Sequence, residues 1–219
     1  REKIGIIGIC GWGGMGLSAT AMDHRVKAVA VASMYEMSRS IGKGYKDAYT
    51  AADRQAVLDL VAKQRWATVD RGGVPVGDYH EHPVIDGKVI SGEVHMLPET
   101  LPADADAVTK QFFDYYRTER GYHQRAINSN GMWNDTIQQS FFNFELLDHI
   151  NEIAPRPVLM IAGFDAHFLY YSQDAYDEIK EQGNVELMII PGANHVDLYD
   201  RVDVIPFDKL DAFFKANLK

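Results

Sequence analysis

Two short apolar runs near the start, separated by a glycine-rich turn, constrain the fold more than any other feature. Lys3–Ile9 (KIGIIGI) and Lys27–Ala32 (KAVAVA) are almost continuously apolar, as are strands buried on both faces of a parallel sheet. Between them, Gly14–Met22 is small and compatible with a helix. The pattern predicts a strand, a tight turn, a helix and a second parallel strand, which together form a βαβ unit.

The same alternation returns near the end of the chain. Pro157–Ala162 (PVLMIA) and Val185–Ile190 (VELMII) are two further candidates for buried strands. Ser172–Gln182 is predicted to be the helix between them, and Gly183 is predicted to end it. Pro206–Leu218 has the pattern of a terminal amphipathic helix. We therefore expect an α/β fold with a mostly parallel sheet and helices on both faces.

The middle of the chain lacks comparable apolar runs and carries helical patterns instead. Three helices are predicted there, at Asp47–Gln64, Ala105–Arg117 and Gln138–Ile150. We expect residues 34–153 to form a helical cap, inserted into a core made of residues 1–33 and 154–219. A separate helical domain is the alternative, but no linker-like composition marks its edges.

Composition and charge exclude several classes of protein. The 219 residues, of which 46% are hydrophobic, are enough for one sizeable core. A net charge of -9 without clusters of Lys and Arg argues against nucleic-acid binding. No apolar stretch approaches the roughly 18 residues of a membrane span. A single cysteine excludes an intrachain disulfide, and with it a disulfide-stapled secreted scaffold.

These properties also shape what we expect of partners and location. We expect no cofactor, no membrane partner and a cytoplasmic protein, while a homodimer is left open. Arg1 is not a natural start, and the chain enters an apolar run almost at once. We therefore expect residues upstream of it, and a signal among them is left open.

The only cysteine lies in the glycine-rich turn after the first predicted strand. Cys10 has Gly8 before it and Gly11 and Gly13 after it, and a nucleophile on a strand-to-helix turn needs small neighbours because the backbone is pinched there. The following helix N-terminus would favour a thiolate, and the Gly11 amide would donate to an oxyanion. Trp12 departs from this pattern, and it is also a pocket candidate. A phosphate-binding loop is the alternative, but the glycines lack the G-x-G-x-x-G order.

A candidate base and a candidate acid follow the two late strands. His195 comes after Val185–Ile190 and Asp165 after Pro157–Ala162, so both would lie at the carboxyl edge of the sheet, where sites form. Asp165 would orient the imidazole and stabilise the imidazolium. Asp174 and Asp197 are competing carboxylates, and Asp174 is expected to face outward on a helix.

Further polar and aromatic residues are weaker candidates. His123 and Trp133 could line a lid over the pocket, but loop hydrogen bonding and a packed tryptophan explain them equally well. His167 lies close to Asp165 in the sequence and is a fourth pocket candidate. His80 and His82 form an H-x-H pair without an obvious further ligand, so we expect no metal site.

Several segments resemble bacterial α/β hydrolases of the YcjY type, which are related to the dienelactone hydrolases. They include Gly8–Gly14 (GICGWGG), Tyr116–Trp133 and Ile190–Arg201 (IPGANHVDLYDR). Fungal polyketide transferases and thiohydrolases are also similar, and the resemblance extends over nearly the whole chain.

This resemblance implies an α/β-hydrolase fold with a helical cap. It implies that Cys10 is the nucleophile, His195 the base and, less directly, Asp165 the acid. It also implies strands before the turn that precede Arg1, including a loop that donates the second oxyanion amide.

We therefore expect a hydrolase that attacks an ester, thioester or lactone of a small-molecule acyl substrate through an acyl-enzyme. Acyl transfer of the polyketide-transferase type is a second hypothesis. A binding protein without activity, in which Trp12 blocks the turn, is a third. The aromatic residues of the insertion suggest an apolar pocket, although a packed cap core would account for them too.

Overall fold

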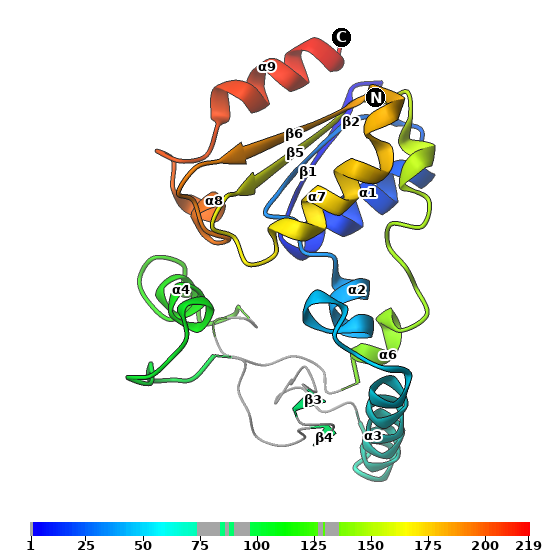
Figure 1. Ribbon diagram of the computed structural model, residues 1–219, viewed down its shortest axis with the longest axis vertical. Helices are drawn as coiled ribbons and strands as arrows, with labels where there is room; N and C mark the ends of the chain where they lie inside the picture. Colours follow the sequence, from blue (N-terminus) through cyan, green and yellow to red (C-terminus); the bar gives the residue numbers. More distant parts are fainter. Residues whose placement is uncertain (1, 74–83, 86–87, 90–96, 127–128, 130–135) are drawn as a thin grey trace. The chain divides into compact units, whose positions relative to one another are not determined.

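The computed structural model describes residues 2–73, 84–85, 88–89, 97–126, 129 and 136–219. The chain divides into two compact units (Figure 1). The core unit comprises Arg1–Met37 and Leu146–Lys219, and the inserted unit comprises Ser38–Glu145. The boundaries predicted from the sequence lie at 33/34 and 153/154, four and eight residues from these divisions.

Four parallel strands form the sheet of the core unit, in the order β1-β2-β5-β6. They are β1 (Ile4–Ile9), β2 (Val26–Ala32), β5 (Val158–Gly163) and β6 (Val185–Ile190). Each coincides within a residue or two with one of the four apolar runs, so the predicted α/β sheet is confirmed. The runs are apolar throughout because successive side chains of β2 and β5 enter cores on opposite faces.

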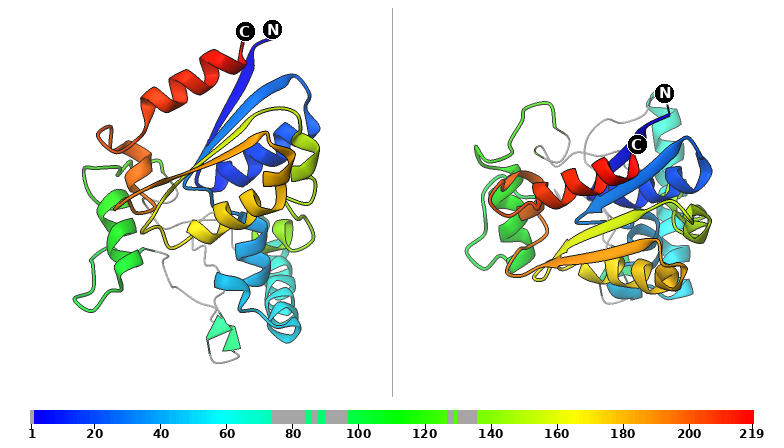
Figure 2. Two further views of the ribbon diagram at one scale, coloured as in Figure 1. Left: turned by 45° about the horizontal axis from the view of Figure 1, so that its top comes forward. Right: turned by 90° about the horizontal axis from the view of Figure 1, so that it is seen from above.

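Helices cover both faces of this sheet (Figure 2). On one face lie α1 (Gly11–Met22) and α7 (Leu169–Ile179), packed on the odd-numbered valines of β2 and the even-numbered residues of β5. On the other face lies α9 (Phe207–Asn217). Its Phe213 and Phe214 pack on those side chains of β2 and β5 that point to this second face. Gly183 adopts φ 72 after α7 and its 3-10 extension, so its predicted role in ending this helical segment is confirmed.

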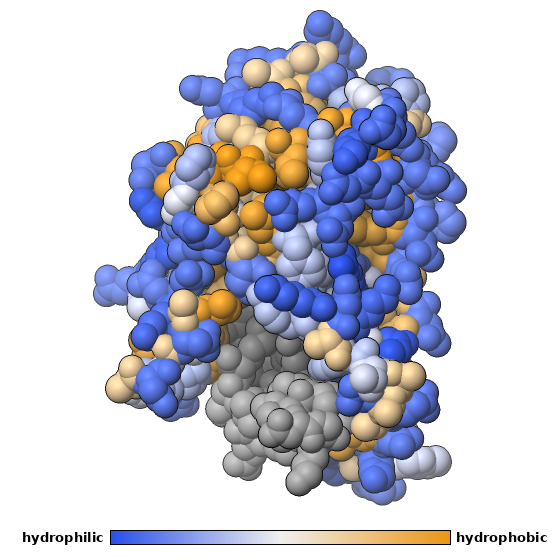
Figure 3. Space-filling model, viewed as in Figure 1, coloured by the Kyte–Doolittle hydropathy of each residue, from blue (hydrophilic) through white to orange (hydrophobic). Residues whose placement is uncertain are grey.

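The outer strands are less well covered than the inner ones. β1 and β6 form the two edges of the described sheet, and Ile7 on β1 is 55% exposed. Apolar side chains gather on the surface of the core unit between α9 and α7 (Figure 3). Ile189 of β6 is one of the exposed apolar residues. Within the described ranges, no helix is both long and apolar enough to cross a membrane.

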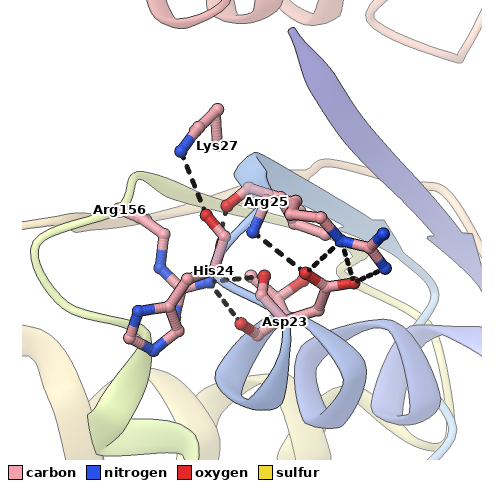
Figure 4. Close-up of polar contacts among 7 residues, drawn as sticks. Asp23, His24, Arg25, Lys27 and Arg156 are labelled. Atoms are coloured by element: carbon pink, nitrogen blue, oxygen red, sulfur yellow. Dashed lines mark hydrogen bonds and ion pairs between the residues drawn. The ribbon is translucent and has the colours of Figure 1, made fainter. Parts of the chain in front are cut away.

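One arginine ties the end of α1 to the loop before β5 (Figure 4). The Arg156 guanidinium donates to the carbonyls of Thr20, of Ala21 at 3.5 Å and of Asp23 at 3.1 Å. On its own side it donates to the Ile153 carbonyl at 3.1 Å. The last carbonyls of a helix have no intrahelical partner, so this side chain supplies the donors they lack. Desolvation in this position lowers the pKa of Arg156 from its ordinary value.

The inserted unit begins with two helices. The first, α2 (Met37–Lys43), starts at the last residue of the core unit and was not predicted. The second, α3 (Ala51–Asp70), starts later than the predicted Asp47 because Thr50 and Asp53 form a reciprocal capping box there.

Two further predictions for the inserted segment can be compared with the structure. α4 (Ala107–Tyr116) lies within the predicted Ala105–Arg117, with Asp106 as its N-cap. The described residues also include a two-stranded hairpin that was not predicted, formed by β3 (Val84–Ile85) and β4 (Lys88–Val89).

The prediction of one continuous helix over Gln138–Ile150 is wrong. Instead, α6 (Gln138–Phe141) is followed by turns and by a 3-10 helix, η2 (Ile150–Ile153). The guanidinium of Arg54 donates to the Phe142 carbonyl at 2.9 Å and lies 4.5 Å from the centre of the Phe142 ring. This tertiary contact occupies a carbonyl that a continued helix would use for its own hydrogen bond.

Candidate active site

Cys10 occupies a strained turn between β1 and α1. Its backbone has φ 57 and ψ -126, a conformation that costs a non-glycine residue on the order of 1–3 kcal/mol and is concentrated at functional sites. The Cys10 amide donates to the Ala32 carbonyl at 3.1 Å, and the Cys10 carbonyl accepts from the amides of Gly13 at 2.8 Å and Tyr35 at 2.9 Å. These bonds tie the turn to the end of β2 and hold the strained geometry.

The glycines around Cys10 are there because neighbouring atoms leave no room for a side chain. A Cβ on Gly8 would lie 2.4 Å from the carbonyl oxygen of Trp12, and one on Gly11 would lie 2.8 Å from the Met37 sulfur. Trp12 therefore presents its backbone to the turn, while its side chain is 72% exposed. This explains how a bulky residue is accommodated two positions after the cysteine.

A second rigid turn carries His195 beyond β6. The Asn194 side-chain oxygen accepts from the amides of Val196 at 3.0 Å and Asp197 at 3.1 Å, and the Asp197 carboxylate accepts from the Asn194 amide at 2.9 Å. The Ser33 hydroxyl, at the end of β2, donates to the His195 carbonyl at 2.6 Å. The histidine backbone is thus fixed both within its own turn and to the neighbouring strand.

The loops after β5 and β6 lie directly against each other. A Cβ on Gly163 would come within 2.2 Å of the Ala193 carbonyl oxygen, and the same carbonyl accepts from the Asp165 amide at 3.0 Å. Only glycine at the end of β5 permits this approach. The contact brings the segment that follows β5 to the turn that carries His195.

The His195 imidazole is buried among aromatic rings. The residue is 1% exposed, and its ring centre lies 5.2 Å from that of His167, 5.6 Å from Tyr199 and 5.7 Å from Phe168. Burial, with a smaller contribution from the charge of His167, lowers the pKa of His195 to about 3. The imidazole is therefore neutral at pH 7, as a general base must be before it accepts a proton.

The Cys10 thiol is also neutral at pH 7. Burial raises the pKa of the Cys10 thiol, whereas hydrogen bonds from the Tyr199 hydroxyl and the Gly11 amide lower it by less. The sequence-based expectation that the helix N-terminus would favour a thiolate is wrong for the net shift, because desolvation outweighs these donors. The thiol of Cys10 and the imidazole of His195 are thus both neutral at pH 7.

The carboxylates of the core unit differ in their surroundings. Asp165 is exposed in the loop after β5, and Asp174 is exposed on α7 as expected. Asp197 is buried, but it accepts from the Asn194 amide and lies 3.6 Å from Arg201. Glu36 is a further buried carboxylate that the sequence reasoning did not single out. The role of Asp165 as the acid stays a prediction.

The remaining candidates from the sequence have different outcomes. His167 lies beside His195 in the core unit. His123 belongs to the inserted unit, where it is exposed and its Nδ1 accepts from the Arg125 amide at 3.1 Å. Trp133, His80 and His82 lie outside the described residues. Among the described side chains, no group of three or more His, Cys, Asp or Glu residues is arranged to hold a metal ion.

Sequence reasoning missed Tyr199, whose ring centre lies 5.6 Å from that of His195. It lies on α8 (Asp197–Asp200), one helical turn after His195. That spacing was visible in the sequence, but the short helix that makes it meaningful was not predicted. Ser33, which anchors the His195 carbonyl, was also missed.

Comparison with known sequences finds relatives but no family model that matches. The chain is 45% identical over 218 residues to the uncharacterized protein PA2218 of Pseudomonas aeruginosa, covering all of this chain and 53% of the relative. It is 24% identical over 206 residues to the uncharacterized protein YcjY of Escherichia coli, covering 91% of this chain and 58% of the relative. The chain thus spans about half the length of the curated relatives it matches.

Solved structures show the same relationship in three dimensions. The crystal structure of PA2218 matches with a TM-score of 0.86 at 43% identity, covering all of this chain and 62% of that one. The crystal structure of GrgF from a Penicillium species, described as an α/β hydrolase, matches with a TM-score of 0.65 at 19% identity, covering 100% and 65%.

Proposed function

We propose that this chain, which has the α/β-hydrolase fold, carries the nucleophile and the base of an enzyme that hydrolyses an ester, thioester or lactone. The observation that supports this most is the strained conformation of Cys10, with φ 57 at the tip of the turn between β1 and α1. Residues keep such strain mainly where function needs it. The buried His195 follows β6, a different strand of the same parallel sheet, so both residues lie beyond the carboxyl ends of their strands.

The first half of the reaction forms a thioester. The Cys10 sulfur attacks the substrate carbonyl carbon while His195 takes the thiol proton, and the amide of Gly11 donates to the developing oxyanion. The bond between carbonyl carbon and leaving group then breaks, and His195 returns the proton to the departing alcohol or thiol. Because thiol and imidazole both begin neutral, proton transfer accompanies the attack and does not precede it.

The second half releases the acid. Water attacks the thioester carbonyl and gives one proton to His195, the carbon–sulfur bond breaks, and the sulfur recovers that proton as the carboxylic acid leaves. Asp165 is the proposed acid of the triad, because a carboxylate near the imidazole favours the imidazolium formed in both halves. His167 and Trp12, both of the core unit, are proposed to contact the substrate.

Intact-mass measurement with p-nitrophenyl esters of graded acyl chain length tests the proposal. We expect release of p-nitrophenol together with a mass increase equal to the acyl group on Cys10, which is the only cysteine. Cys10→Ala should show neither the acyl adduct nor the release of p-nitrophenol, and His195→Gln should lose turnover. The exposed His24 offers a matched control, so His24→Gln should keep full activity.

Two outcomes would count against the proposal. Ester cleavage that persists in Cys10→Ala would show that another group is the nucleophile. Loss of activity in His24→Gln equal to that in His195→Gln would show that the loss is not specific to the buried imidazole. Adding an alcohol acceptor separates hydrolysis from acyl transfer, because only a transferase would form the new ester in preference to the free acid.

A further inference from the structure

Ser33, the first residue after β2, has a strained backbone although it takes no part in the reaction proposed above. Its φ is 46, in the left-handed region that few residues other than glycine adopt. Glycine would take up this conformation without the steric cost of a Cβ. Strain of this kind persists where the surrounding structure imposes it, and it is concentrated at functional sites. A serine at this point is therefore explained only by what its hydroxyl does.

The Ser33 hydroxyl holds the turn that carries the proposed base. It donates to the His195 carbonyl at 2.6 Å, and both residues are almost completely buried, with exposed fractions of 2% and 1%. The Ser33 amide donates at 2.9 Å to the carbonyl of Ile161 in β5. A single residue thus joins the end of β2 both to the neighbouring strand and to the turn beyond β6.

The residues on either side of Ser33 hold the proposed nucleophile. The Ala32 carbonyl accepts from the Cys10 amide at 3.1 Å, and the Tyr35 amide donates to the Cys10 carbonyl at 2.9 Å. Because Ser33 lies between these two contacts, the path of the chain that makes both of them depends on its left-handed conformation. Among the described residues of the core unit, Cys10 and Ser33 are the two non-glycine residues with positive φ, and they lie in turns that are bonded to each other.

We propose that Ser33 is a positioning residue of this site, whose hydroxyl fixes the backbone of His195 relative to the turn of Cys10. This inference rests on the proposed function and deepens it. Thiol and imidazole must lie at a defined separation to react, and a misplacement of about 1 Å can lower a rate by roughly a hundredfold. The bonds of Asn194 and Asp197 join residues within the histidine's own turn. The Ser33 hydroxyl joins that turn to β2, the strand whose end holds Cys10.

The test compares two replacements that remove the same hydroxyl but differ in backbone strain. Ser33→Ala keeps a Cβ at φ 46 and Ser33→Gly does not, so Ser33→Gly should require more urea to unfold than Ser33→Ala. Both should lower kcat for cleavage of p-nitrophenyl esters by roughly tenfold to a hundredfold and leave KM nearly unchanged, because the imidazole is misplaced in each. Activity should therefore follow the hydroxyl and not the stability of the fold.

Thr20→Val is the matched control. The Thr20 hydroxyl is buried in the same unit and donates to the Gly16 carbonyl at 2.7 Å, so this change also removes one buried hydroxyl that is bonded to a backbone carbonyl. It should lower the stability without changing kcat. Unchanged kcat in both Ser33 variants, or an equal fall of kcat in Thr20→Val, would overturn the proposal. So would a kcat that follows stability, with Ser33→Gly recovering most of the activity that Ser33→Ala loses.

Amide hydrogen exchange separates a failure of this inference from a failure of the proposed function. Exchange in the peptide that contains residues 194–197 should be faster in both Ser33 variants than in the wild type, and unchanged in Thr20→Val. A wild type that cleaves no ester would overturn the hydrolase, while faster exchange confined to the Ser33 variants would still support the anchoring of His195. Unchanged exchange in this peptide would overturn the anchoring whether or not an ester is cleaved.

Discussion

Lowering the pH from neutral should destabilise the protein through His195, a residue that is buried and neutral in the fold. Its pKa is about 3 in the folded state and 6.5 for an ordinary histidine. Between these values the unfolded chain binds a proton that the folded chain does not. Stability therefore falls as the pH falls through this window, and this contribution levels off above it.

The size of the effect follows from the two pKa values. The full difference corresponds to roughly 5 kcal/mol, reached only below the folded pKa. Between pH 7 and pH 5 the same relation gives a loss of roughly 2 kcal/mol. That is a large part of the stability of an ordinary domain, so it is measurable above the background titration of other groups.

Urea denaturation at pH 7 and pH 5 provides the assay, applied to the wild type, His195→Gln and His24→Gln. Carboxylates and the other histidines titrate in all three proteins, so differences between the proteins isolate one imidazole. The wild type and His24→Gln should lose about 2 kcal/mol more than His195→Gln. An equal loss in all three would refute the reasoning, because it would mean that His195 is hydrated or accepts a proton without unfolding.

Two further predictions concern the turn and the end of α1. Gly8→Ala should lower the free energy of unfolding by about 1–3 kcal/mol, because its Cβ would meet the Trp12 carbonyl oxygen at 2.4 Å. Gly73→Ala is the control, since a Cβ there meets nothing within 4 Å. Equal stability of the two variants would contradict the steric argument. Arg156→Met should lower the free energy of unfolding, measured by urea denaturation, by about 2 kcal/mol, because the carbonyls at the end of α1 lose their donors. Arg25→Met removes only an exposed ion pair with Asp23 and should change the free energy of unfolding little. The reverse order would contradict the role assigned to Arg156.

The parts of the structure that were predictable are those where local pattern and global fold agree. Val29 and Met160 lie in strands buried on both faces, so their runs are apolar without interruption, and the predicted parallel sheet is confirmed. The turn at Cys10 was visible because its crowded backbone demands glycines at Gly8 and Gly11. In each case a single short segment contains the whole physical constraint.

The parts that were missed depend on residues distant in the sequence. The end of α6 coincides with a hydrogen bond from Arg54 to the Phe142 carbonyl, which no periodicity reveals. The raised pKa of the Cys10 thiol results from desolvation by the assembled fold, against which the helix N-terminus is the weaker influence. The contact between the rings of Tyr199 and His195 became visible only once α8 was found directly after the turn.

The hydrogen bonds around Cys10 and His195 join neighbouring strands and loops of the core unit. Cys10 is bonded to Ala32 and Tyr35, Ser33 to His195, and the loop of Asp165 to that of Ala193. The chain departs for the inserted unit after Met37 and returns at Leu146, so these bonds bypass it altogether. Exchanging the intervening segment should therefore leave these hydrogen bonds, and with them the backbone positions of Cys10 and His195, unchanged.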